Sequence, residues 1–130
     1  MVVVDASVLV EILLGTEAGL RASDRLLQAT GALHAPHLVD VEVLNAMRGL
    51  ARRREVAPAR AELALRDMLE LRIERYPHGP LLARAWQLRD GVSAYDAMYV
   101  ALAENLGAPL VTRDRKLGRA HGHRARIELL

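Results

Sequence analysis

Short strand-like runs alternate with longer helical segments along this chain of 130 residues, and this alternation constrains the fold more than any other feature. The β-branched run Val2-Val3-Val4 and the apolar run Leu110-Val111-Thr112 are the clearest strands. Three weaker strand candidates cover residues 33–35, 72–76 and 127–130. Helical periodicity covers residues 6–14, 17–28, 38–54, 58–71, 81–89, 94–106 and 115–119. Strands separated by helices predict an α/β fold whose parallel sheet is covered on both faces.

Composition places the chain among globular proteins and removes several classes of function. Apolar residues make up 52% and charged residues 26%, and the length fits one domain that covers residues 1–130. No run approaches the roughly 18 apolar residues of a membrane span. The first residues lack a basic region and reach an acid at Asp5, unlike a secretory signal. Because cysteine is absent, disulfides, thiolate metal sites and a thiol nucleophile are excluded, and we expect a cytoplasmic protein without a membrane partner.

Basic residues are concentrated near the C-terminus, although the formal net charge is only +2. Between residues 113 and 126 a single acid, Asp114, accompanies six basic residues. These are Arg113, Arg115, Lys116, Arg119, Arg124 and Arg126. Arginine binds phosphate groups through paired hydrogen bonds, so the segment is a candidate for contact with nucleic acid. A genome rich in G and C would also produce an arginine-rich chain, and charge alone does not separate the two explanations.

Three acids stand where a parallel sheet would place a binding site. Asp5 directly follows the first strand, and Asp114 lies two residues beyond the strand at 110–112. Asp96 lies in the first turn of the helix at 94–106, which is otherwise apolar around most of its circumference. Such a helix is expected to be buried, so that its early carboxylate faces the interior or a cleft. In open α/β sheets the site lies outside the carboxyl ends of the strands, and we expect the three carboxylates there.

A fourth acid comes from the long helix at 38–54, where Glu42 and Asp40 are the two candidates. On a helical wheel Asp40 points toward the apolar side, and we therefore choose Glu42. The polar side of that helix carries Glu42, Asn45, Arg52 and Arg53, and the apolar side carries Val39, Val43, Met47 and Leu50. An ordinary solvent-exposed glutamate would fit the same pattern.

Each acid also has an ordinary structural explanation. The acids after the two strands are in position to cap the helices that follow, and Ser93-x-x-Asp96 matches a loose capping box. These explanations weaken when the acids are considered together, since clustered carboxylates repel one another and need a compensating cation. An all-oxygen donor set favours Mg²⁺ or Mn²⁺. His121 and His123 lie in a basic loop, where solvent exposure or phosphate contact is a better explanation than a metal site.

Four blocks of the sequence together resemble the motifs of PIN-domain nucleases, and they occur in the order of that family. The first is Val2-Val3-Val4-Asp5-Ala6-Ser7-Val8-Leu9-Val10, and the second runs from Ala35-Pro36-x-Leu38 to Glu42-x-x-Asn45-Ala46-x-Arg48. The third is Ser93-Ala94-Tyr95-Asp96-Ala97-x-Tyr99-Val100-Ala101-Leu102-Ala103, and the fourth is Pro109-Leu110-Val111-Thr112-x-Asp114-x-x-Leu117. The blocks span nearly the whole chain, and they are most similar to the small VapC-type toxins of bacterial toxin–antitoxin pairs.

The resemblance implies a Rossmann-like three-layer α/β/α sandwich with a mostly parallel sheet of five strands. The acidic, metal-binding and catalytic pocket that it implies is formed by Asp5, Glu42, Asp96 and Asp114, with Ser7, Asn45 and Thr112 beside it. The implied activity is that of an endoribonuclease, the toxin of a type II toxin–antitoxin system. Such an enzyme hydrolyses phosphodiester bonds of tRNA or another structured RNA through a water activated by Mg²⁺ or Mn²⁺.

Three other functions stay open at this point. A PIN-type nuclease of RNA maturation or of structured DNA would carry the same acids, although such proteins usually contain additional domains. A signalling receiver also places acids around Mg²⁺ at strand ends. It needs an acid pair after the first strand and a lysine after the last, whereas here Asp5 stands alone and Lys116 is the only lysine. A catalytically inert PIN-like binding module is disfavoured because all four acids are present.

The expected partners are an RNA substrate, a cognate antitoxin and a second copy of the chain in a homodimer. The residues expected to hold RNA phosphates are Arg113, Arg115, Lys116 and Arg119. Tyr95 and Tyr99 are expected in the core, so no aromatic platform for bases is predicted. Apolar residues of the first two helices would either receive an antitoxin helix or belong to the core. They are Val8, Leu9, Ile12, Leu13, Leu26 and Leu27.

Overall fold

The computed structural model describes residues 1–29 and 31–130, and this part of the chain contains five strands among seven α-helices and one 3₁₀ turn. The strands are β1 (Val2–Val4), β2 (Leu33–Pro36), β3 (Ile73–Tyr76), β4 (Leu110–Thr112) and β5 (Ile127–Leu129). The helices are α1 (Ala6–Leu14), α2 (Glu17–Leu27), α3 (Leu38–Arg52), α4 (Pro58–Glu70), α5 (Leu82–Gln87), α6 (Ala94–Leu106) and α7 (Arg115–Arg119), with the 3₁₀ turn at Gly79–Leu81. The predicted α/β fold is confirmed.

The bounds differ from the predicted ones mainly at the ends of helices. α3 ends at Arg52 rather than at residue 54, because Arg54 has a left-handed backbone with φ 59°. The segment predicted as one helix at 81–89 begins within the 3₁₀ turn, and α5 ends at Gln87. α2 ends at Leu27, and its predicted stop at Thr30-Gly31 includes Thr30, which lies outside the described residues. None of these shifts moves an acid out of the element predicted to carry it.

All five strands of the sheet run parallel, in the order β3-β2-β1-β4-β5. β1 lies at the centre, where Val3 pairs with His34 of β2 on one side and with Leu110 of β4 on the other. From β1 the chain first adds strands toward β3 and later adds them toward β5. The order therefore reverses between β1 and β4, and ligands of open α/β sheets bind at such a reversal.

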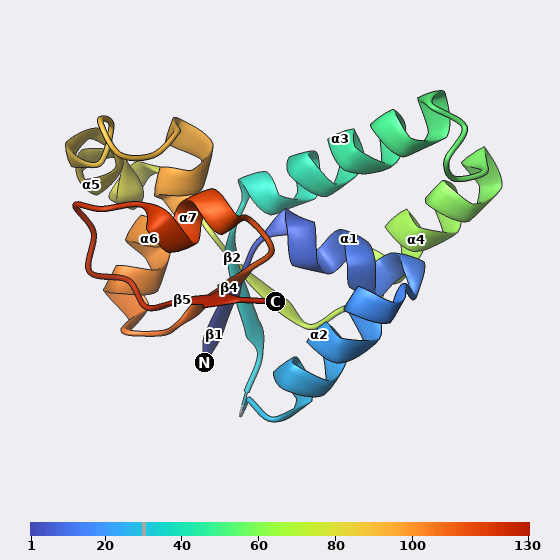
Figure 1. The fold of residues 1–130 in the computed structure, drawn as a ribbon, viewed down its shortest axis with the longest axis horizontal. Helices are drawn as coiled ribbons and strands as arrows, with labels where there is room; N and C mark the ends of the chain where they lie inside the picture. Colours follow the sequence, from blue (N-terminus) through green and yellow to red (C-terminus); the bar gives the residue numbers. More distant parts are fainter. Residues whose placement is uncertain (30) are drawn as a thin grey trace.

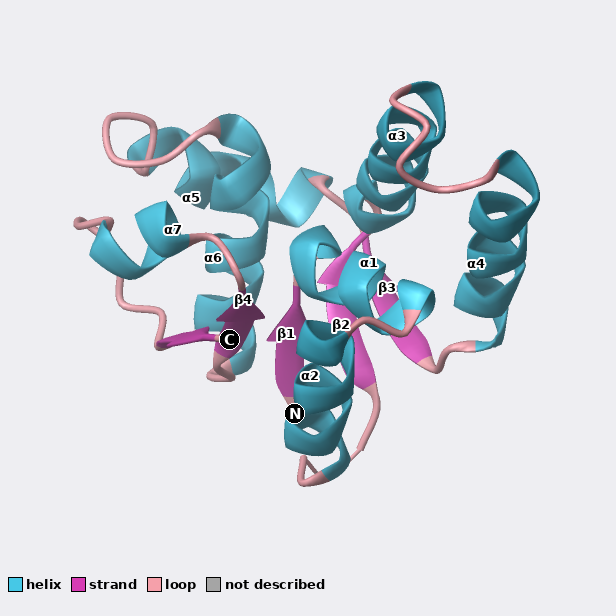
Figure 2. Ribbon diagram, turned by 45° about the vertical axis from the view of Figure 1, so that its right-hand side comes forward, coloured by secondary structure: helices cyan, strands magenta, loops and turns pink. Residues whose placement is uncertain are grey.

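Helices cover both faces of the sheet, in the three-layer arrangement that the resemblance implied. In Figure 1, α1 to α4 lie on the right of the sheet and α5 to α7 on its left, and Figure 2 shows the strands between these groups. α6 contacts β1, β2 and β4, so it lies directly against the centre of the sheet. No described helix is long and apolar enough to cross a membrane.

The apolar side chains of α1 and α2 belong mostly to the core. The buried ones are Val8, Leu9, Leu13 and Leu26. Ile12 is half-buried and packs against this core, and of the set only Leu27 is strongly exposed, at 83%. The prediction that these residues form a docking surface for an antitoxin helix is therefore wrong. Their alternative assignment to the core is correct for all of them except Leu27, because both helices turn the other five side chains inward.

α1 and α2 approach each other closely because α2 has a glycine at the contact. Gly15 turns the chain with φ 64°, and the hydroxyl of Thr16 then accepts a 3.0 Å hydrogen bond from the N–H of Gly19. A Cβ atom on Gly19 would lie only 2.0 Å from the carbonyl oxygen of Glu11. Since that oxygen belongs to the backbone of α1, the clash could be relieved only by moving the helices apart. The position of α1, which carries Ser7, therefore depends on this glycine.

Gly19→Ala is expected to lower the free energy of unfolding by about 2–4 kcal/mol, because the added methyl group forces α1 and α2 apart. In a helix without a close neighbour the same change is favourable by roughly 0.5–1 kcal/mol. Gly79→Ala is the matched control, because a Cβ at that position meets no atom within 4 Å. Urea unfolding followed by circular dichroism measures both variants. Equal stability of the two variants would contradict the close approach of the helices.

Candidate active site

The carboxylate of Asp5 is buried where the strand order reverses, and the residue is only 7% exposed. Its Oδ1 accepts hydrogen bonds from the Ser7 hydroxyl at 2.6 Å and from the Val8 backbone N–H at 3.3 Å. Its Oδ2 accepts a hydrogen bond from the hydroxyl of Thr112 at the end of β4. Burial raises the pKa of Asp5 above its ordinary value, and the hydrogen bonds from the two hydroxyls and from the backbone lower it. Asp5 is therefore both the cap of α1 and a carboxylate clamped between two elements.

The two hydroxyls also attach Asp5 to the loop that follows β4. The Ser7 oxygen accepts a 3.1 Å hydrogen bond from the backbone N–H of Arg113. The Thr112 oxygen accepts a 3.0 Å hydrogen bond from the backbone N–H of Asp114. Because each hydroxyl donates its proton to Asp5, its oxygen is free to accept from the loop. Asp114, whose carboxylate caps α7, is thus brought to the same edge of the sheet as Asp5.

Glu42 comes from α3 and is held by a tyrosine of α6. Tyr99 is buried, and its hydroxyl donates a 2.6 Å hydrogen bond to Oε1 of Glu42. Burial raises the pKa of Glu42, the bond from Tyr99 lowers it, and the charges of Asp5 and Asp96 raise it. The pKa of Tyr99 is itself raised far above its ordinary value by burial and by the carboxylate that it binds. The tyrosine therefore stays protonated and acts as a donor to Glu42.

Asp96 faces the same region from the first turn of α6. The hydroxyl of Ser93 accepts a 3.1 Å hydrogen bond from the backbone N–H of Asp96, so the predicted cap is present. Burial raises the pKa of Asp96, and the charges of Asp114 and Asp5 raise it further, while Ser93 and Lys116 lower it. Beyond this turn α6 is buried along most of its length, as predicted. Asp96 therefore lies at the start of a helix and is also repelled by the charges of the other acids.

The four acids interact through their charges, and we call them the acidic cluster. Their carboxylates are not close enough to one another to coordinate one ion without moving. Repulsion connects Asp5, Glu42 and Asp96 with one another. Repulsion also connects Asp96 with Asp114. Among the described residues, no three histidine, aspartate or glutamate side chains lie close enough to hold one ion together as they stand. A hard cation would remove the repulsion that separates the carboxylates, and oxygen donors of this kind suit Mg²⁺ or Mn²⁺.

Asp40 lies apart from the acidic cluster. It is exposed on α3 and forms an ion pair with Arg75 of β3, with an N···O distance of 2.8 Å. The prediction that Asp40 points toward the apolar side of the helix is therefore wrong, because an arginine of the neighbouring strand draws it to the surface. Asn45, one turn after Glu42, is exposed and lines a hollow beside the cluster.

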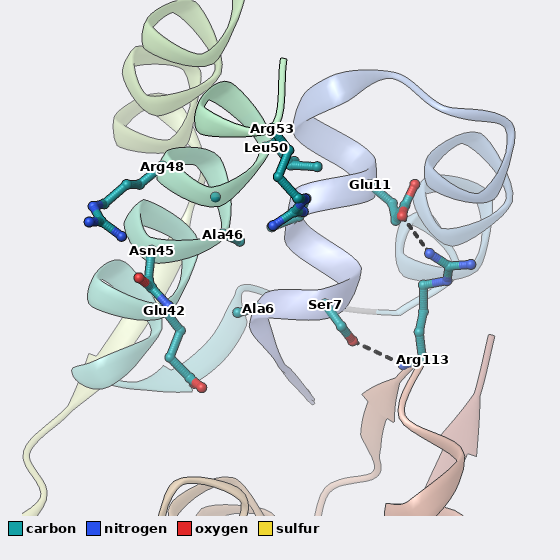
Figure 3. Close-up of a pocket in the computed structure, with 12 residues that line it drawn as sticks. Ala6, Ser7, Glu11, Glu42, Asn45, Ala46, Arg48, Leu50, Arg53 and Arg113 are labelled. Carbon is teal, nitrogen blue, oxygen red and sulfur yellow. Dashed lines mark hydrogen bonds and ion pairs between the residues drawn. The ribbon is translucent and has the colours of Figure 1, made fainter. Parts of the chain in front are cut away.

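This hollow, of about 560 Å³, lies between α1 and α3, and we call it the α1–α3 hollow (Figure 3). Its lining from α1 is Ala6, Ser7, Val10 and Glu11, and its lining from α3 and the end of that helix is Glu42, Asn45, Ala46, Arg48, Gly49, Leu50 and Arg53. Arg113 completes the lining from the loop after β4 and forms an ion pair with Glu11. Figure 3 also shows Arg53 reaching into the hollow from the end of α3. Acidic and basic side chains therefore share this hollow.

The basic residues predicted to hold RNA flank the acidic cluster on two sides. Arg113 lines the α1–α3 hollow. Lys116 lines a second hollow of about 360 Å³, together with Asp96 and Asp114. The two other arginines of this set, at positions 115 and 119, are exposed on α7. Their contact with RNA stays a prediction, and the positions of the first two residues are compatible with it.

Tyr99 and Tyr95 were both expected in the core, and the structure confirms this for Tyr99 alone. Tyr99 lies in the core as expected, but its bond to Glu42 also makes it part of the site. The position of Tyr99 one helical turn after Asp96 is a signal that could have indicated this role. Tyr95 was expected in the core and is 66% exposed, so this prediction is wrong. It lies in the first turn of α6.

Comparison with known proteins gives one consistent family. The family model of the PIN domain matches residues 2–122. Ribonuclease VapC12 of Mycobacterium tuberculosis is 42% identical over 130 residues, which cover 100% of this chain and 99% of the relative. VapC ribonuclease Mb0985 of Mycobacterium bovis is 44% identical over 117 residues, which cover 90% of this chain and 88% of the relative. The crystal structure of VapBC2 from Rickettsia felis, bound to a promoter DNA fragment, has the same fold, with a TM-score of 0.72 at 14% identity over 100% of this chain and 99% of that chain.

Tyr99→Phe is expected to raise the pKa of Glu42 further, because the variant loses a hydrogen bond that favours the ionised carboxylate. The buried ring is kept, so the free energy of unfolding should fall by about 1–3 kcal/mol, as for a bond to a charged group. The loss should be larger at neutral pH than below the ordinary glutamate pKa of 4.5, where the carboxyl is protonated in both the folded and unfolded states. A carbon NMR titration of the Glu42 carboxyl in the metal-free protein measures the pKa.

Tyr95→Phe is the matched control for this prediction. The hydroxyl of Tyr95 makes no hydrogen bond within the described part of the chain, and the residue is exposed. The control should leave both the pKa of Glu42 and the free energy of unfolding unchanged. An unchanged Glu42 pKa in Tyr99→Phe would show that the hydroxyl does not hold the carboxylate in solution.

Proposed function

The chain belongs to the PIN domain family and is a ribonuclease of the VapC type, and we propose that it cuts RNA with a divalent metal ion bound at the acidic cluster. The observation that carries the proposal is the Asp5 carboxylate, which is buried, held by hydrogen bonds from Ser7 and Thr112, and repelled by Glu42 and Asp96 of the same acidic cluster. Acids that raise the pKa of one another weaken a fold unless a cation compensates them. Groups with pKa values shifted in this way gather at functional sites.

The residues of the acidic cluster fit Mg²⁺ or Mn²⁺, because their side chains offer only carboxylate oxygens. The residues that would hold the ion are Asp5, Glu42, Asp96 and Asp114. When bound, such an ion lowers the pKa of a water molecule and stabilises negative charge on phosphate oxygens. The chain supplies orientation, since Ser7 and Thr112 fix the carboxylate of Asp5 and Tyr99 fixes that of Glu42. Carboxylates held by such outer partners need little rearrangement to act as ligands.

RNA would reach the acidic cluster along its basic flanks. Arg113 lines the α1–α3 hollow on one side, and Lys116 lies beside Asp96 on the other. Their cations would contact phosphates on both sides of the bond that is cut, and the arginines of α7 would extend this contact. We place tRNA or another structured RNA as substrate, because these contacts would read the backbone and its shape rather than the bases.

The protein partner is the cognate antitoxin of a VapC-type toxin, as in the solved toxin–antitoxin complexes of this fold. We propose that the antitoxin covers the acidic cluster and presents a positive side chain to it, since clustered carboxylates attract any cation. We also propose that the chain, as one PIN domain over residues 1–130, forms a homodimer and acts in the cytoplasm.

Asp5→Asn should lower the cleavage of tRNA by at least about 100-fold in the presence of Mg²⁺ or Mn²⁺, because an amide is a poor ligand for these ions. The fold should persist, since asparagine caps a helix as well as aspartate does. The metal-free variant should melt at the same temperature as the wild type or higher, because one repelling charge is removed. Gel assays of tRNA cleavage and thermal melting measure the two effects.

Asp40→Asn is the matched control, because it removes a carboxylate from α3 outside the acidic cluster. Asp40 is paired with Arg75 at the surface, where such ion pairs contribute little. Its cleavage rate should stay within about twofold of the wild type. Near-normal cleavage by Asp5→Asn, or an equal loss in both variants, would refute the proposed site.

Mg²⁺ or Mn²⁺ should raise the melting temperature of the wild type, and this gain should shrink as the pH falls. Burial raises the pKa values of Asp5, Glu42 and Asp96, so the folded chain keeps protons in the acidic range that the unfolded chain has already lost. The metal-free fold therefore loses stability as the pH rises through that range. A metal ion must displace the same protons, so it binds better at higher pH.

Differential scanning fluorimetry at about pH 5 and about pH 8, with each metal and with a chelator, measures this gain. The chelator should return the melting temperature to its metal-free value. Asp5→Asn should show little gain at either pH. A gain that is the same at both values, or the same in Asp5→Asn, would place the ion outside the acidic cluster.

A further inference from the structure

The side chain of Arg53 lies over a glycine at the end of α3, inside the α1–α3 hollow. Gly49 and Arg53 both line the hollow, and they are four residues apart on the helical face that also carries Asn45. The Nη1 atom of Arg53 lies 3.0 Å from the position that a Cβ atom on Gly49 would take. Glycine weakens a helix interior relative to alanine. Here the missing side chain gives the guanidinium the room that it occupies.

Arg53 contributes little to the stability of the fold through its contacts with the described residues. Its side chain is 61% exposed, and its ion pair is with Glu55, which is itself 55% exposed, at 3.4 Å. An exposed pair of this kind contributes little to stability. Figure 3 shows the guanidinium directed from the end of α3 into the hollow. The guanidinium is therefore accessible to a ligand that enters the hollow.

The charges along the α1–α3 hollow change from acidic to basic. Glu42 marks the acidic end, where the hollow meets the acidic cluster. Glu11 and Arg113 form an ion pair and neutralise each other. The lining also includes the cations of Arg48 and Arg53, and Figure 3 shows Arg53 at the opposite end of the hollow from Glu42. A ligand that suits this pattern has one negative group for a cation at the cluster and a further negative group for the arginines.

We propose that Arg53 binds a phosphate of the RNA that flanks the cleaved bond, and that Gly49 keeps this phosphate subsite open. The proposal rests on the ribonuclease function above and adds to it a surface outside the basic segment at 113–126. RNA supplies the required spacing of negative groups along one strand, and the planar fork of arginine binds phosphate oxygens in pairs. The RNA then leaves the acidic cluster along α3, between that helix and α1.

Arg53→Ala and Arg52→Ala are compared in the Asp5→Asn background, so that the RNA is bound without being cut. Arg52 is the matched control, because it is the preceding exposed arginine of α3 and does not line the hollow. Fluorescence anisotropy with labelled bulk tRNA, in Mg²⁺ buffer over a salt series, measures affinity. Arg53→Ala should weaken binding about three- to tenfold and reduce the log–log salt slope by about 0.7–0.9, the value for one phosphate contact. Arg52→Ala should change binding by less than about twofold.

Gly49→Ala tests the room that the glycine provides. The variant should raise the melting temperature by a few degrees, because alanine favours the helix. It should also weaken tRNA binding, since the added carbon displaces the guanidinium of Arg53. A gain in stability with a loss in affinity separates this effect from general damage to the fold. Arg53→Lys keeps the charge without the fork, and its affinity should lie between those of the wild-type residue and Arg53→Ala.

Equal affinities of Arg53→Ala and Arg52→Ala would overturn the phosphate subsite. Affinity of Gly49→Ala equal to that of the glycine-containing protein would overturn the role of Gly49. Failure of the wild type to cleave RNA, together with failure of Asp5→Asn to bind it, would instead overturn the ribonuclease function. The two failures are distinguishable, because the second removes binding from every variant alike.

Discussion

A carboxylate buried where the two neighbouring parallel strands β1 and β4 end is the constraint on which the site depends. Removing Asp5 from water is unfavourable, and the hydroxyls of Ser7 and Thr112 offset this by donating to both of its oxygens. Ser7 is on α1 and Thr112 is on β4, so both elements must keep their positions relative to β1. The same two hydroxyls also hold the loop after β4, because their oxygens accept hydrogen bonds from the backbone N–H groups of Arg113 and Asp114. One buried group thereby sets the place of a second acid.

The remaining two acids depend on how two helices pack rather than on the sheet edge. Glu42 is on α3, and the tyrosine that fixes it is on α6, which also carries Asp96. α6 can hold both in place because it is buried against β1, β2 and β4. The favourable packing of α6 against the sheet thus offsets the repulsion among the acids. A site that weakens the fold is tolerated where the surrounding structure is most constrained.

The sequence was sufficient for the elements and for the acids at their ends. β1 and β4 could be predicted because β-branched runs form buried strands, and the caps Ser93 and Asp5 begin their helices as expected. The wheel failed for Asp40 because it describes an isolated helix, and Asp40 is drawn outward by Arg75, 35 residues away. The bond between Tyr99 and Glu42 joins residues 57 apart. Such contacts follow from the angles between packed helices, which periodicity does not contain.

At the proposed site, the arrangement of charge would make cation binding and RNA binding support each other. Without a cation the acidic cluster repels a phosphate that the arginines of the α1–α3 hollow attract. With a cation the two ends of the hollow attract the same strand, and the bound phosphate in turn adds a negative oxygen near the ion. Linkage requires the two effects to be equal in size, so RNA must tighten cation binding by the factor by which the cation tightens RNA binding. An antitoxin that places a positive side chain beside Asp5 and Glu42 would neutralise the repelling carboxylates without a metal ion. It would therefore compete with both partners at once, which is what silencing of such a nuclease requires.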